Sequence, residues 1–212
     1  LGIAPGPANG FTLDLIYSFE QFGELMDWAM IILNPLEPWP GRLCLKAAEN
    51  ADIDILTRVV DYGGIFHGTM KPDHEFRAGD HRTYRPSGWV EEGLRRVDNM
   101  RSIIDKYDLS ELHFSCLWNL SHTPVRSVVP TFIQEAGDDA KPIEDLVREY
   151  GTLPIESPFS QAEVDEIAAI GDNTGCMMLK GASNRHAESL RPDEWPMSCL
   201  LYTSDAADEE RG

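Results

Sequence analysis

Short apolar segments of strand length alternate along this chain with longer segments of helical period, and this alternation constrains the fold more than any other feature. Apolar runs such as AMIIL at 29–33 suit strands that are buried on both faces. Strands and helices that alternate in this way are typical of α/β proteins, in which helices cover a parallel sheet. The strand-like segments are 1–5, 29–33, 52–60 and 126–130, and the helix-like segments are 11–28, 42–50, 89–107, 110–122, 138–151 and 160–171. The sequence therefore predicts about four βα units, which form either a small open sheet or half of an eight-unit barrel.

Two of the helix-like segments carry end signals. Ser160 and Glu163 have the spacing of a capping box, and Gly171 follows the last apolar position of that helix. The segment 138–151 starts with Asp at the expected N-cap, has a proline in its first turn and ends on Gly151. We therefore expect helices over 138–151 and 160–171.

Composition excludes several classes of function. The formal net charge of −18 and the pI near 4.6 disfavour binding to nucleic acid, because an acidic surface repels phosphate backbones. The chain has no apolar run of about 18 residues, the length that a membrane-spanning helix requires, so no membrane partner is expected. The four cysteines, at 44, 116, 176 and 199, form no CxxC pair, which argues against a zinc knuckle or a disulfide scaffold. A reducing, cytoplasmic location is the resulting expectation, and Cys116 is expected in the core.

Several segments in one order carry a family resemblance. GIAPGPANGFTLDLI, NPLEPWPGR, TRVVDYGGIFHG, WNLS followed by VVP, and IGDNTGC together resemble one branch of the aldo/keto reductases, over about residues 1–197. The resemblance implies the C-terminal half of a (β/α)8 TIM barrel that binds NADP or NAD, with its site at the carboxyl ends of the strands. It implies an oxidoreductase that moves a hydride between the nicotinamide and a small carbonyl or alcohol, such as a sugar or an aldehyde. The alternative is a non-catalytic, nucleotide-binding relative of the barrel.

The resemblance also bears on how much of a domain is present. The catalytic Asp, Tyr, Lys and His of the family belong to its first four strands, so we assign no catalytic residue here and expect this fragment to be inactive. Half a barrel leaves two open sheet edges, so poor solubility or oligomerisation is also expected. The ending CLLYTSDAADE resembles a translated sequencing adapter. We therefore expect a partial reductase domain over 1–197 and a non-native tail over 198–212.

The resemblance places cofactor contacts after the third and the last strand. These candidates are Arg58, Val59, Asp61, Gly63 and Gly64, then Pro130, Thr131, Ile133 and Gln134. Arg58 stands where the family usually has an aromatic ring, and its planar guanidinium could stack on the nicotinamide. The alternative for Arg58 is a salt bridge to Asp61 or to a neighbouring loop. Gly63 and Gly64 would let backbone N–H groups approach the pyrophosphate, or would form an ordinary glycine turn. For Asp61 the alternative is a contact with substrate or with an arginine.

Other polar positions are open to two interpretations. The segment TFIQEAGDD at 131–139 lacks the cation that the family usually offers to the adenosine 2′-phosphate, so the choice between NADP and NAD stays open. Asn34 matches a common family Asn and is expected to brace the rim of the barrel. Trp39 either walls a substrate pocket or anchors its loop. The histidines at 67, 74 and 81 are spaced by seven in a polar loop, and no metal site is assigned to them.

Overall fold

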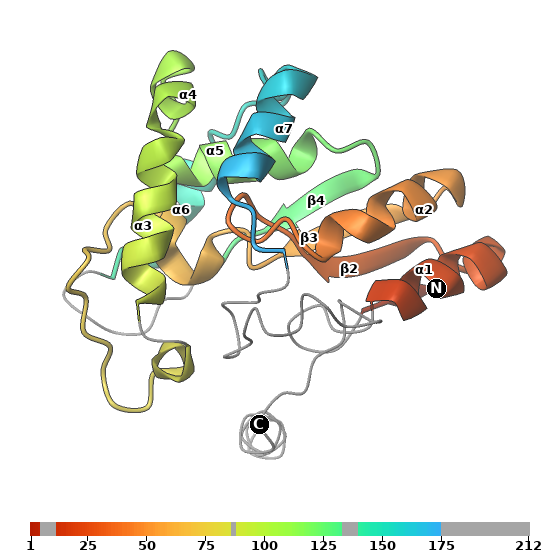
Figure 1. Cartoon of the computed structure of the whole chain (residues 1–212), viewed down its shortest axis with the longest axis horizontal. Helices are drawn as coiled ribbons and strands as arrows, with labels where there is room; N and C mark the ends of the chain where they lie inside the picture. Colours follow the sequence, from red (N-terminus) through yellow and green to blue (C-terminus); the bar gives the residue numbers. More distant parts are fainter. Residues whose placement is uncertain (5–11, 86–87, 133–139, 175–212) are drawn as a thin grey trace.

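The computed structural model describes residues 1–4, 12–85, 88–132 and 140–174. Its centre is one sheet of four parallel strands in the order β1-β2-β3-β4, so strands that follow one another along the chain are neighbours in the sheet (Figure 1). The strands are β1 (Gly2–Ile3), β2 (Trp28–Ile32), β3 (Asp54–Arg58) and β4 (Val125–Val129). Parallel neighbours joined by helical crossovers are the repeating unit of a (β/α) barrel. The predicted α/β class with four βα units is confirmed.

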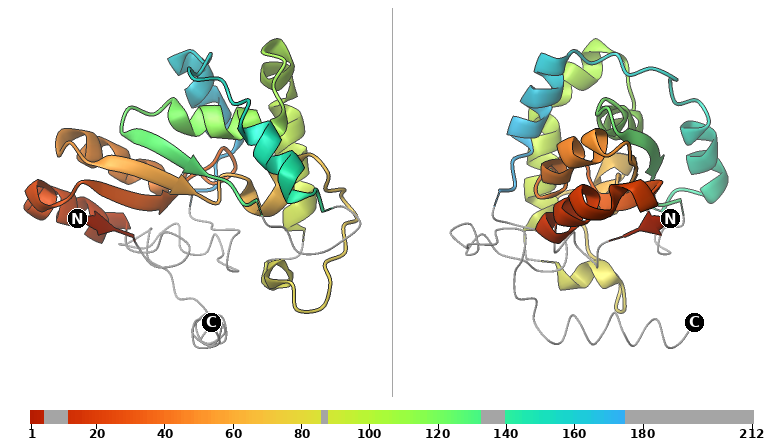
Figure 2. Two further views of the ribbon diagram at one scale, coloured as in Figure 1. Left: turned by 180° about the vertical axis from the view of Figure 1, so that it is seen from behind. Right: turned by 90° about the vertical axis from the view of Figure 1, so that its right-hand side faces the viewer.

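Seven α-helices and four 3₁₀ turns are found in the described residues. The views in Figure 2 place α6 beyond β4, where the Tyr150 hydroxyl donates to the Val128 carbonyl at 3.0 Å. The α1 and α2 helices pack on each other and lie toward β2 and β3. The α-helices are α1 (Thr12–Phe22), α2 (Leu45–Asn50), α3 (Trp89–Asn99), α4 (Arg101–Lys106), α5 (Glu111–Leu120), α6 (Ile143–Tyr150) and α7 (Gln161–Ile170). The 3₁₀ turns are η2 (Gly23–Leu25), η3 (Gly41–Cys44), η4 (Tyr62–His67) and η5 (His81–Tyr84).

Four predicted helices have different bounds in the structure. The helix expected over 42–50 is α-helical only from Leu45, because the 3₁₀ turn η3 precedes it. The helix expected over 11–28 ends at Phe22, because residues from Trp28 onward pair with β1 and β3 instead. The helix expected over 89–107 is divided at Met100 into α3 and α4. The helix expected over 138–151 begins only after Pro142, since the residue that precedes a proline is disfavoured in helical conformation. The capping box of Ser160 and Glu163 and the end of α7 at Gly171 are confirmed.

The two faces of the sheet differ in their burial. Ala29, Ile31, Ile55 and Val128 point to one face and are buried under the helices. This face continues into a core that includes Phe19, Phe114, Cys116, Trp118 and Ile167. Trp118 also donates its indole N–H to the Val164 carbonyl at 3.0 Å, which ties α5 to α7. The expected core position of Cys116 is confirmed.

The opposite face is the one that would line the interior of a closed barrel. Most of its residues are half-buried or exposed, and these include Met30, Leu56, Arg58, Ser127 and Val129, while Ile32 at the end of β2 is buried. Side chains alternate between the two faces of a strand, so Arg58 points away from the helix-covered side that holds Thr57. No helix among the described residues is long and apolar enough to cross a membrane. The predicted tail at 198–212 lies outside the described residues.

Candidate functional site at the carboxyl edge of the sheet

Strands β2, β3 and β4 end in register at one edge, where Ile32, Arg58 and Val129 are neighbours. The loops that leave this edge hold most of the buried polar side chains of the described residues. Figure 1 shows the loop after β3 in orange to yellow, passing α3 on its way to η5. Barrel proteins keep their chemistry at this end of the strands. The carboxyl edge is therefore the candidate site.

The chain turns after β3 through unusual backbone conformations. Val59 and Tyr62 have positive φ angles of 58° and 50°, and Gly63 and Gly64 follow at 68° and 101°. A positive φ is a genuine outlier for a β-branched residue such as valine. Such strain persists only where surrounding contacts hold the backbone in place, and it concentrates at functional sites. Here the Val59 carbonyl accepts hydrogen bonds from the Asn34 side chain at 3.0 Å and from the Tyr62 N–H at 3.0 Å.

Two guanidinium groups from the loop between β3 and α3 also form hydrogen bonds to this turn. Arg85 donates to the Tyr62 carbonyl at 3.3 Å, and Arg82 donates to the Gly63 carbonyl at 3.2 Å. Asp80 binds Arg82 in turn through both carboxylate oxygens. Arg85 also lies 4.1 Å over the centre of the Trp89 ring. The turn after β3 is therefore fixed by two cations.

Gly63 lies close to the Arg85 side chain and also has a positive φ angle. A Cβ at this position would lie 2.2 Å from the Arg85 guanidinium, well inside van der Waals contact. The glycine thus permits the close approach of Arg85, which a larger residue would prevent. The sequence interpretation considered an approach of the backbone to a pyrophosphate or an ordinary glycine turn, and it did not foresee the close approach of Arg85.

Asp61 joins the turn after β3 to the loop after β4. Its carboxylate accepts hydrogen bonds from the Thr131 N–H at 3.2 Å and the Thr131 hydroxyl at 3.1 Å. Its other oxygen lies 3.5 Å from His67 Nε2, and both side chains are buried. Burial alone would raise the pKa of Asp61, but the His67 side chain and the Thr131 N–H outweigh burial and lower it. An ionised Asp61 is therefore a fixed link between the two loops.

Glu37 is the buried carboxyl group that sequence reasoning missed. It is 1% exposed, and neither carboxylate oxygen has a hydrogen-bond partner within the described residues. Burial raises the pKa of Glu37 to about 8, although the charges of Arg85 and Arg58 and the Asn34 side chain act to lower it. No motif or spacing marked this position, because the two arginines that act on it, Arg58 and Arg85, are more distant in the sequence and its burial depends on the tertiary structure.

The loop that carries Glu37 is held at several points. Asn34 accepts from the Leu36 N–H at 2.9 Å while it donates to Val59. Trp39 donates its N–H to the side chain of Asn173 at 2.9 Å, and its carbonyl accepts from the same side chain at 2.8 Å. The bracing role expected for Asn34 is confirmed. Trp39 is buried and, through its backbone, anchors the loop to the segment after α7.

The residues proposed for cofactor binding are partly brought together. Arg58, Val59, Asp61, Gly63 and Gly64 lie on one strand end and its turn, and Thr131 reaches Asp61 from the neighbouring strand with Pro130 beside it. Ile133 and Gln134 lie outside the described residues. Burial lowers the pKa of Arg58, while the charge of Glu37 on the loop after β2 acts to raise it. The alternative of a salt bridge from Arg58 to Asp61 or to a neighbouring loop stays a prediction. Whether these residues bind a cofactor stays a prediction.

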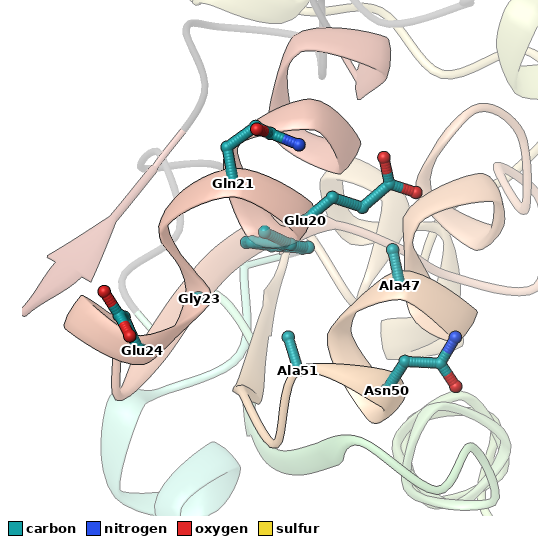
Figure 3. A pocket seen from close by; sticks show the side chains of 8 residues that line it. Glu20, Gln21, Gly23, Glu24, Ala47, Asn50 and Ala51 are labelled. Atoms are coloured by element: carbon teal, nitrogen blue, oxygen red, sulfur yellow. The ribbon is translucent and has the colours of Figure 1, made fainter.

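Two further features lie apart from this cluster. A cavity of about 400 Å³ opens between the ends of α1 and α2, where Glu20, Ala47 and Asn50 border it (Figure 3). These helix ends lead into the starts of β2 and β3, so this cavity is at the amino edge, where barrel proteins place residues for stability. Among the described residues, no three His, Cys, Asp or Glu side chains are placed to share a metal ion.

The chain was compared with known proteins. No family model and no curated protein matches it. Solved structures do match. An aldo-keto reductase from Bacillus halodurans, AKR11C1 in its holo form, aligns with a TM-score of 0.53 and 12% identity, over 88% of this chain and 52% of that one. The described part of the chain has the fold of part of an aldo-keto reductase barrel. The glycerol dehydrogenase AKR11B4 from Gluconobacter oxydans aligns with a TM-score of 0.48 and 19% identity, over 74% of this chain and 60% of that one.

This chain spans about half the length of the Bacillus halodurans aldo-keto reductase. The four parallel strands therefore correspond to part of an aldo-keto reductase barrel, as the resemblance implied. At 12% identity the likeness concerns the fold, and one fold can support several functions. The chemistry of this chain has to be argued from its own carboxyl edge.

Proposed function

We propose that the chain is part of an NAD(P)-dependent oxidoreductase of the aldo-keto reductase type, and that its carboxyl edge holds the dinucleotide. The observation that carries this proposal is the strained turn after β3, which two arginines fix at the sheet edge where barrel proteins bind ligands. Cations and glycine-rich turns are the groups that proteins use to bind diphosphates. The residues present therefore fit such a group.

In this proposal each part of the cluster has its own task. Arg58 offers a planar cation at the carboxyl end of β3, on the face that would line the barrel. The backbone of Gly63 and Gly64 would lie close to the diphosphate. Asp61 acts as a positioning residue, because its hydrogen bonds to Thr131 hold Thr131 and the adjoining Pro130 beside the glycines. The bound nicotinamide would supply the hydride, and the substrate would be a small carbonyl or alcohol. No catalytic residue is assigned to these 212 residues, which we expect to bind the cofactor without turnover.

A non-catalytic nucleotide-binding barrel is the second candidate. It is favoured by the altered cofactor contacts, which include Arg58 in place of the usual aromatic ring and a segment 131–139 that lacks the cation usual for the adenosine 2′-phosphate. The coding sequence upstream of this chain distinguishes the two candidates. Asp, Tyr, Lys and His at the ends of preceding strands would support hydride transfer. Replacement of the Tyr or the Lys would support the binding barrel.

The test of the cofactor site is a fluorescence titration of the whole chain with NADH and with NADPH. We expect Arg58→Gln to weaken binding about tenfold, the loss typical of one charged hydrogen-bond partner. Arg126→Gln is the matched control, because Arg126 lies near the start of β4 and its side chain is exposed beside Asp54. Absence of binding by both dinucleotides, or equal affinities in the wild type and Arg58→Gln, would overturn the proposal.

A further inference from the structure

The loop after β4 begins with two residues whose hydrogen-bond donors are not available to a ligand. Thr131 donates both of its donors to Asp61, its N–H at 3.2 Å and its hydroxyl at 3.1 Å. Pro130, which precedes it, has no N–H. A ligand that meets the loop at this point therefore finds acceptors and no donor on Pro130 or Thr131.

The buried carboxylate of Asp61 fixes the direction of these hydrogen bonds. Its second oxygen lies 3.5 Å from His67 Nε2, and the side chains of Asp61 and His67 are both buried, whereas Thr131 is exposed. An ionised carboxylate can only accept hydrogen bonds, so the single hydroxyl proton of Thr131 points inward to Asp61. Thr131 is thus the residue that a ligand would meet, and its oxygen offers lone pairs.

The sequence around Thr131 adds no positive charge to this end of the site. Residues 130–139 include three acidic residues and no lysine, arginine or histidine. The basic residue of β4 itself, Arg126, lies near the start of the strand and pairs with Asp54 at 3.1 Å. Proteins bind phosphate groups with cations and N–H donors. The carboxyl end of β4 is therefore poorly suited to a phosphate group and well suited to a group that donates a hydrogen bond.

We propose that Thr131 accepts a hydrogen bond from a ribose hydroxyl of the ligand, and that the site consequently prefers NADH to NADPH. This inference rests on the proposed function, in which the diphosphate lies beside the turn after β3. Because Asp61 ties Thr131 to that same turn, a ribose next to the diphosphate is expected beside Thr131.

The exposed position of Thr131 suits the ribose of the adenosine, since the end of the dinucleotide that transfers hydride belongs where water is excluded. NADH carries a 2′-hydroxyl on this ribose, and NADPH carries a phosphate ester in its place. The hydroxyl can donate to Thr131. The phosphate ester has no counter-charge from residues 130–139 and is repelled by the acidic residues of that segment.

The test compares the affinities for NADH and NADPH by fluorescence titration of the whole chain at neutral pH. The wild type should bind NADH about tenfold more tightly than NADPH, the effect typical of one charged group without a partner. Thr131→Val removes the accepting oxygen and should weaken NADH binding about fivefold, while NADPH binding stays unchanged. A merely structural role of Thr131 would weaken both equally. Thr131→Ser keeps the hydroxyl and should bind NADH as the wild type does.

A gain of binding tests the same inference from the opposite direction. Thr131→Lys supplies a cation at the exposed end of β4 and should raise the affinity for NADPH about tenfold. Thr152 is the matched control position, because it is exposed after α6 and its hydroxyl donates to the Glu149 carbonyl at 2.8 Å. Thr152→Val and Thr152→Lys should both keep the wild-type preference.

The outcomes separate this inference from the proposed function. Equal affinities of the wild type for NADH and NADPH, or equal losses of both in Thr131→Val, would overturn the inference and leave the proposed function standing. An unchanged preference in Thr131→Lys would do the same. Failure of both dinucleotides to bind the wild type would overturn both.

Discussion

Replacement of Glu37 by glutamine should stabilise this protein, and by an amount that grows with pH. The pKa of Glu37 rises from 4.5 to about 8 because the folded protein buries it. The folded state therefore holds its proton more tightly than the unfolded state does. The stability that this proton gives is fully present below pH 4.5 and is lost as pH rises through about 8. Glutamine is neutral at every pH and keeps the shape of the side chain.

The magnitude follows from the two pKa values. Each pH unit between them changes the relative free energy of unfolding by about 1.4 kcal/mol, so wild type should lose about 4 kcal/mol relative to Glu37→Gln between about pH 5 and about pH 8. Above about pH 8 the difference should level off, since Glu37 is then ionised in both states. Half of this value would already be a large share of the stability of an ordinary domain.

Urea unfolding of the whole chain, followed by tryptophan fluorescence at a series of pH values, measures this difference. Trp118 is fully buried and reports the loss of the core. Glu49→Gln removes an exposed carboxylate and serves as the control for a general charge effect. If Glu37→Gln and wild type show parallel stability profiles from about pH 5 to about pH 8, the argument that Glu37 is buried with a raised pKa is refuted.

Three further predictions concern the same edge of the sheet. Asp61→Asn should lower the free energy of unfolding at neutral pH by about 1–3 kcal/mol. The lowered pKa of Asp61 stabilises the fold only while the carboxylate is ionised. Urea titrations should therefore show the difference between variant and wild type shrink as pH falls. Gly63→Ala should lower the free energy of unfolding by about 1 kcal/mol or more beyond the loss caused by Gly79→Ala. Both residues have positive φ angles, but only Gly63 is crowded by Arg85. Equal melting temperatures for the two variants would contradict the steric role of Gly63. Asn34→Ala should destabilise the chain by about 1–3 kcal/mol in the same assay, because it leaves the Leu36 N–H without its partner and removes one of the two hydrogen bonds to the Val59 carbonyl. An unchanged midpoint would show that Asn34 does not hold the strained turn.

Much of the fold could be predicted from the sequence because its signals are local. The apolar runs at 29–33, 52–60 and 126–130 coincide with β2, β3 and β4 to within a few residues. The capping box of Ser160 and Glu163 depends only on residues three positions apart, and it is present in α7. The break at Met100 was missed, since the apolar stripe continues from α3 into α4 without a proline or glycine to mark it.

The candidate site was predicted only in outline. The sequence placed Arg58, Asp61 and the glycines of the turn at the end of one strand, because these positions follow one another along the chain. It could not show that Asp61 holds Thr131, which is 70 residues away. The pairing of these two residues depends on the register of β3 against β4, and only the tertiary structure determines that register.

The sequence by itself determined the order of strands and helices, the sheet edge that carries the polar residues, and the acidic charge of the chain. The tertiary structure decided which charges meet. Glu37, Arg58 and Arg85 come from three separate segments, and none of them has a local pattern that indicates a buried contact. Their pKa values depend on burial and on neighbours in space, so the chemistry of this edge arises only when the loops after β2 and β3 fold together.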